Sequence, residues 1–102
     1  MADRVEVDED GVTARIGERV EQVRWDDLAG VAILTTDQGP FVDDMFWVLG
    51  RTDDTTVVVP SEAQGTDVLL ARLQRLPGFD NEAVVAASAC VEDGTFLCWR
   101  RD

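Results

Sequence analysis

The chain contains no histidine, no lysine and no tyrosine. Without these residue types, the usual general acids and bases reduce to carboxylates and cysteine. The hydroxyls of Ser61 and Ser88 also have no imidazole to activate them. A carboxylate pair could still perform acid–base chemistry, but that normally needs a deep cleft, which a chain of 102 residues seldom builds. The composition therefore predicts a non-enzymatic protein.

The sequence is also poor in metal ligands of the nitrogen and sulfur type. Its two cysteines, Cys90 and Cys98, form no CxxC pair, so they match no zinc site. In a reducing compartment we expect them to be free, buried and small-apolar, with a disulfide or a redox role as the alternative. A calcium site at Asp37, Asp43 and Asp44 is a further alternative, although the spacing matches no EF-hand loop. We predict no metal and no cofactor.

Long apolar runs are missing as well. No stretch approaches the roughly 18 apolar residues that a membrane span needs, and residues 1–4 lack the basic-then-apolar plan of a secretory signal.

The chain is strongly acidic: it has nine basic residues, all arginines, and 21 acidic residues, for a net charge of −12. Such a field repels phosphate backbones and anionic lipid head groups. We therefore predict a cytoplasmic protein that binds neither nucleic acid nor membranes. Its predicted partner is another protein, and a basic protein would complement the negative charge. Alternatively, the acidity serves only solubility or salt adaptation.

The sequence does contain clear strand patterns. Its length and 45 % apolar fraction predict a single domain over residues 1–102. Alternating apolar residues and turn signals predict strands near residues 5–7, 12–16, 20–25, 31–36, 46–49 and 56–59. The run 31–36 is mostly apolar and 46–49 is wholly apolar, so we expect both to be buried on both faces.

After residue 60 the apolar period becomes helical. One helix is predicted from an N-cap at Thr66 to the Pro77-Gly78 break, and a shorter one from an N-cap at Asp80. A last strand follows near residues 96–99. The expected fold is α+β: a bent antiparallel sheet of about six to seven strands, forming a barrel or roll, packed by two C-terminal helices.

Some segments resemble known families. Residues 23–31 (VRWDDLAGV) resemble bacterial pleckstrin-homology-like domains, which implies such a fold for the N-terminal two thirds. Residues 35–41 (TTDQGPF) and 76–84 (LPGFDNEAV) are similar to small uncharacterised bacterial proteins, which carry no known activity. The first family binds phosphoinositides through basic residues in its early hairpin loop, but residues 8–11 read DEDG here. The two helices and added strand after the sheet also depart from that family, which ends in one helix.

The most unusual local feature is the loop at residues 37–44. We interpret it as a binding loop, in which Phe41 is an apolar anchor and carboxylates accept hydrogen bonds from a partner. Its candidate partner-binding residues are Asp37, Gln38, Gly39, Pro40, Phe41, Asp43 and Asp44. Alternatively, the loop is a long hairpin connection whose Phe41 packs on the sheet edge.

Two functions follow from these features. The leading hypothesis is a protein-interaction module in a bacterial cytoplasm, either as a homodimer or with another protein. Trp99, beside two arginines, could mark an edge strand that pairs two copies. The alternative is an acidic inhibitor or immunity-type protein that masks the basic active site of a toxin or nuclease.

Overall fold

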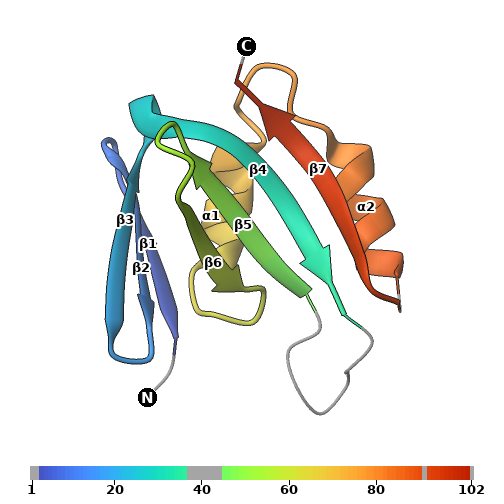
Figure 1. Ribbon diagram of the computed structural model, residues 1–102, viewed down its shortest axis with the longest axis horizontal. Helices are drawn as coiled ribbons and strands as arrows, with labels where there is room; N and C mark the ends of the chain where they lie inside the picture. Colours follow the sequence, from blue (N-terminus) through green and yellow to red (C-terminus); the bar gives the residue numbers. More distant parts are fainter. Residues whose placement is uncertain (1–2, 37–44, 91, 102) are drawn as a thin grey trace.

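The computed structural model describes residues 3–36, 45–90 and 92–101. Six strands precede two helices and a final strand (Figure 1). The strands are β1 (Arg4–Val7), β2 (Gly11–Ile16), β3 (Arg19–Arg24), β4 (Leu28–Thr35), β5 (Met45–Arg51), β6 (Thr56–Pro60) and β7 (Gly94–Arg100). The helices are α1 (Thr66–Leu73) and α2 (Asn81–Ala89), and a 3-10 turn, η1 (Trp25–Asp27), joins β3 to β4.

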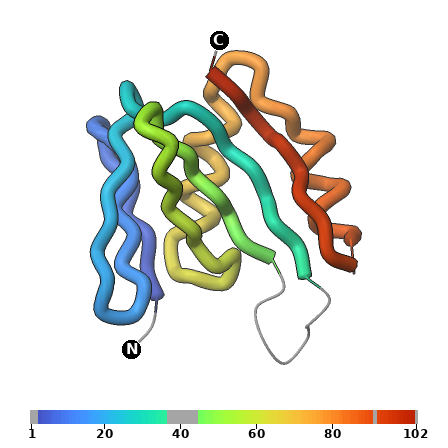
Figure 2. Tube along the Cα trace, in the orientation of Figure 1, coloured from blue at the N-terminus to red at the C-terminus, as the bar shows by residue number. Residues whose placement is uncertain are grey.

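These strands form two antiparallel sheets. One has the order β1-β2-β3 and the other the order β6-β5-β4-β7. The α+β class and the two helices are confirmed, but the single bent sheet of six to seven strands is wrong. The larger sheet has four strands, and within the described residues β3 and β6 do not pair, so no barrel closes. The physical reason is η1, which breaks the ladder between β3 and β4; β3 and β6 then diverge away from this corner (Figures 1 and 2).

The corner at η1 is held by hydrogen bonds from both ends of the chain. The indole Nε1 of Trp25 donates to the carbonyl of Asp8 at 2.9 Å. Directly after β7, Arg101 donates to the carbonyls of Leu28 (Nε, 2.8 Å) and Trp25 (Nη2, 2.9 Å). Since a guanidinium holds its donors in a fixed fork, Arg101 fixes the angle of the corner as well as its position.

The core lies between the two sheets and the helices. Helix α1 packs against β1, and α2 packs against β7 and β4. Both helices lie on the same side of the four-stranded sheet (Figure 1). The largest fully buried side chains are Leu28, Ile33, Leu49, Leu69, Leu73, Val12, Val23, Val31, Val57, Val59, Thr35 and Cys98. The predicted apolar stripe of the first helix is therefore confirmed by Leu69 and Leu73.

The helix starts differ in how they are capped. The Asp80 carboxylate accepts from the N–H of Ala83 at 3.2 Å, which confirms the predicted cap of α2. The predicted Thr66 cap of α1 is wrong. Gly65 occupies the N-cap with φ of 91°, while the Thr66 hydroxyl donates to the carbonyl of Ser61 at 2.9 Å. The left-handed backbone at Gly65 turns the chain so that this segment can lie against β1.

We predict that Gly65→Ala strongly destabilises the protein. A Cβ at Gly65 would lie 2.2 Å from the carbonyl oxygen of Val5, and its φ is +91°. Gly17→Ala is the matched control, because its φ of +61° is also left-handed but its Cβ would meet nothing within 4 Å. We expect the control to cost about 1 kcal/mol of unfolding free energy, and Gly65→Ala more than about 3 kcal/mol. Urea unfolding measures both, and equal losses would contradict the close approach.

Candidate interaction surface

The side of the four-stranded sheet that faces away from the helices is apolar. Side chains alternate along a strand, and the register places Leu97, Ala32, Val48 and Val58 in one row across all four strands. Leu34 and Phe46 lie side by side in the next row. We call the following residues the apolar face: Ala32, Leu34, Phe46, Val48, Val58 and Leu97.

This apolar face is open to solvent. Leu97 is 56 % exposed, Val58 44 % and Leu34 37 %, and the other members are partly exposed. The rows are completed by Thr95 and Pro60, so they hold no charged residue, although 29 % of the chain is charged. Contiguous exposed apolar surface of this kind is typical of interaction sites.

The expectation that residues 31–36 and 46–49 are buried on both faces is therefore wrong. The physical reason is that both helices pack on one face of the sheet, and nothing among the described residues covers the other. The sequence signal for the apolar face is that apolar and polar residues do not alternate in these two segments. That signal does not distinguish a second buried face from an exposed apolar one.

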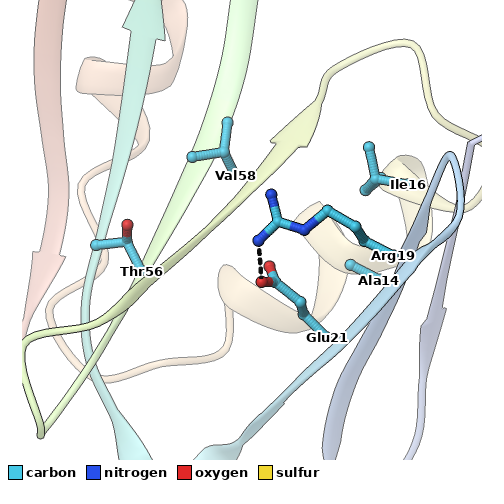
Figure 3. Close-up of a pocket in the computed structure, with 6 residues that line it drawn as sticks. All are labelled: Ala14, Ile16, Arg19, Glu21, Thr56 and Val58. Carbon is cyan, nitrogen blue, oxygen red and sulfur yellow. Dashed lines mark hydrogen bonds and ion pairs between the residues drawn. The ribbon is translucent and has the colours of Figure 1, made fainter.

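A groove of about 300 Å3 lies between the two sheets (Figure 3). Its lining residues are Ala14, Ile16, Arg19, Glu21, Thr56 and Val58. Arg19 and Glu21 point from β3 toward β6 and form an ion pair, with Nη2 and Oε1 2.6 Å apart. The side chain of Arg19 is 78 % exposed and that of Glu21 30 %. Val58 belongs to both the groove and the apolar face, so the two are continuous.

Arg51 closes one end of the groove. Its guanidinium donates twice to the carbonyl of Gln22 on β3, from Nη2 at 2.8 Å and from Nε at 3.2 Å. The backbone N–H of Thr52 also donates to the carbonyl of Asp27 at 3.0 Å. These bonds hold β3 near the β5–β6 turn, and the strands diverge from there toward the β2–β3 hairpin (Figure 1).

The β6 wall of the groove is a free strand edge. Hydrogen bonds from Arg51 N–H to the Thr55 carbonyl (2.8 Å) and from Ser61 N–H to the Met45 carbonyl (3.0 Å) lie at the two ends of the β5–β6 ladder. In both bonds the residue on the β6 side, Thr55 or Ser61, has an odd number. Hydrogen-bonded and non-hydrogen-bonded residue pairs alternate along an antiparallel ladder, so the odd-numbered residues of β6 are the ones that bond to β5. The even-numbered residues of β6 therefore direct their backbone groups away from β5.

Those even-numbered residues are Thr56, Val58 and Pro60. The N–H and C=O groups of Thr56 and Val58 face the groove and have no hydrogen-bond partner in the described part of the chain. Pro60 has no N–H to offer, so the edge ends there. Within β6, the backbone of Thr56 and Val58 is thus available to an incoming strand.

The β3 wall is the second free edge. The N–H of Trp25 donates to the Asp10 carbonyl at 3.0 Å, in register with the β2–β3 ladder, so odd-numbered residues of β3 bond to β2. Even-numbered residues point the other way, as the bond from Arg51 to Gln22 shows. Val20 therefore directs both of its backbone groups away from β2, and so does the N–H of Gln22, which has no hydrogen-bond partner in the described part of the chain.

We predict that amide exchange distinguishes the two edges of β6. The N–H of Val58 has no acceptor among the described residues, so we expect it to exchange with solvent at close to the rate of an unstructured peptide. The N–H of Val57, one residue away, bonds to β5 and should exchange at least about 100-fold more slowly. Residue-resolved NMR exchange on the free protein at low concentration measures both. Equal protection of the two amides would show that the β6 edge is covered.

The predicted binding loop lies outside the described residues. Asp37, Gln38, Gly39, Pro40, Phe41, Asp43 and Asp44 all fall within residues 37–44. Their role in partner binding therefore stays a prediction. The strand ends that this loop joins are described, and they carry Leu34 and Phe46 of the apolar face.

The environment of Cys98 does not favour a nucleophile. Both cysteines are free, as predicted, but only Cys98 is buried, and Cys90 is partly exposed. Burial, together with the smaller effect of the nearby Asp80 carboxylate, raises the pKa of the Cys98 thiol to about 11. At pH 7 such a thiol is ionised in about one molecule in 10⁴. In the described ranges no three His, Cys, Asp or Glu side chains gather as metal ligands. The non-enzymatic assignment stays a prediction.

The two thiols should therefore differ in reactivity. Cys98 is 1 % exposed and its thiol pKa is raised, so we predict that iodoacetamide alkylates it far more slowly than Cys90 at pH 8. The rate for Cys98 should rise as the pH increases toward 11, because its thiolate fraction grows. Mass spectrometry of each cysteine peptide over time gives the two rates. Fast alkylation of Cys98 in the folded protein would contradict its burial.

The C-terminal edge strand is partly closed. Trp99 Nε1 donates to the carbonyl of Pro77 at 2.9 Å, and the N–H of Asp80 donates to the carbonyl of Cys98 at 2.7 Å. The segment before α2 therefore occupies part of the β7 edge. The homodimer through Trp99 stays a prediction.

Comparisons with protein-family models, curated proteins and solved structures match nothing to this chain. The resemblance to pleckstrin-homology-like domains therefore stays a prediction. Among the described residues, no helix has both the length and the apolar character needed to cross a membrane.

Proposed function

We propose that this protein is a non-enzymatic protein-interaction module that binds its partner through the apolar face. The observation that carries this proposal is the uncharged, exposed surface across β4, β5, β6 and β7. Removing apolar surface from water contributes about 25 cal/mol per Å2 of favourable free energy. Burial of the apolar face by a partner therefore stabilises the complex. Polar residues surround the face, with Thr95, Thr56 and Arg100 among them, as in protein interfaces with an apolar centre and a polar rim.

The acidic inhibitor is the second candidate, and the net charge of −12 favours it. Ion pairs engage Glu6, Glu21 and Asp26, while other carboxylates, such as Glu62 and Asp67, are exposed. Binding to a basic active site through such carboxylates weakens steeply as salt is raised. Docking through the apolar face is less sensitive to salt, so partner binding that persists at high salt would contradict an inhibitor that binds through carboxylates alone.

We predict that Leu97→Glu abolishes partner binding. A carboxylate at this position places a charge in the row of the apolar face that crosses all four strands, next to Ala32. Val85→Glu is the matched control, because Val85 is 69 % exposed on α2, away from the apolar face. With each variant as immobilised bait in a lysate of the source cells, quantitative mass spectrometry should show at least about tenfold less partner for Leu97→Glu than for Val85→Glu. Equal recovery from both baits would overturn the proposal, provided that circular dichroism shows both to be folded.

A further inference from the structure

Both walls of the groove offer the backbone groups that a β-strand uses. Thr56 and Val58 present two N–H and two C=O groups from β6, and Val20 and Gln22 present groups from β3. We propose that the groove binds an extended, basic segment of a partner protein, which adds a strand between the two sheets. This inference rests on the proposed function and names the form that its partner takes.

Because the groove has a strand on each side, β3 and β6, it favours binding of a single extended segment over binding of a folded copy of this chain. Each strand of a folded sheet already has a neighbour on at least one side, so it can bond to one wall only. Here β3 and β6 lie on opposite sides of the groove (Figure 3), and each has one edge that is not paired within its own sheet. An isolated extended segment has both of its own edges free, and it alone can bond to both walls.

A second folded copy is also disfavoured on the apolar face. Two rows across four strands cover roughly 19 by 14 Å, or about 270 Å2. A standard stable interface needs about 800 Å2 from each partner. In addition, each copy carries a net charge of −12, so two copies repel each other. A segment in the groove lies beside Val58 and extends the apolar face by one strand, which enlarges the surface that the whole partner covers.

Side chains of the bound segment alternate between two environments. Those pointing inward meet Ala14, which is buried, and Ile16, which is partly buried. Those pointing outward continue the row that ends at Val58. The contacts at Ala14, Ile16 and Val58 are apolar, so the segment needs apolar residues where it meets them.

The charge of the groove favours a basic residue in the segment. Glu21 is the less exposed member of its ion pair with Arg19, at 30 % against 78 %. Because an exposed pair is worth little, an incoming arginine or lysine can take the place of Arg19 on Glu21 while Arg19 turns to solvent. The net charge of −12 also attracts a basic segment over a longer range.

The test uses the intact protein and a displayed library of random linear peptides of about 12 residues, enough to span the β6 edge. Val58→Pro removes the N–H that faces the groove, which an edge strand tolerates. Val58→Thr is the matched control, since it keeps the N–H and the branched shape. We expect selected peptides to be rich in apolar and basic residues, and to bind Val58→Pro at least about tenfold more weakly than Val58→Thr. Glu21→Gln should weaken those with a basic residue.

Amide exchange of the unmodified protein gives a readout that does not depend on the variants folding. Binding of a selected peptide should protect the N–H groups of Val20 and Val58, while that of Val57 stays protected throughout. The proposal is overturned if no peptide is enriched, if the peptides bind Val58→Pro as well as Val58→Thr, or if these amides stay unprotected. In those cases, loss of partner binding by Leu97→Glu would still support the proposed function, so the two failures are distinguishable.

Discussion

The hydrogen bonds around η1 determine the architecture of this protein. Trp25 bonds to the β1–β2 turn, and Arg101 bonds to the carbonyls of Trp25 and Leu28, so the chain leaves the first sheet at a fixed angle. Because β3 and β4 cannot pair across this turn, the seven strands divide between two sheets. Arg51 then joins the sheets near the corner through the carbonyl of Gln22. The strands diverge away from this tie, and the groove lies between them.

The two candidate binding features are consequences of this arrangement. A closed barrel would have paired β3 with β6 and left no free backbone groups on either edge. It would also have curved the four-stranded sheet around its core. Here the sheet receives both helices on one face, so Val48 and Leu97 remain on an outer surface. The groove and the apolar face meet at Val58, which places the free edge and the apolar rows beside one another.

The sequence predicted features that depend on neighbouring residues. The strand positions follow from alternation, the cap of α2 follows from Asp80, and the buried stripe of α1 follows from its leucines. The sheet pairing was not predictable, because whether β3 meets β6 depends on the angle that Arg101 sets from the far end of the chain. The groove likewise joins Glu21 to Val58, and no local pattern relates them. The predicted loop at residues 37–44 stays a hypothesis, since it lies outside the described residues.

Exposed apolar rows and free strand edges normally carry a risk of self-association. A net charge of −12 counters that risk, since every approach of a second copy brings like charges together. Arg19 adds a local obstacle, because its side chain points over the groove and must move before a strand can enter. The same field attracts a positively charged segment, whose basic residue can replace Arg19 on Glu21. The net negative charge therefore repels a second copy of the chain and attracts a basic segment. This difference makes the apolar face and the groove selective for a basic partner.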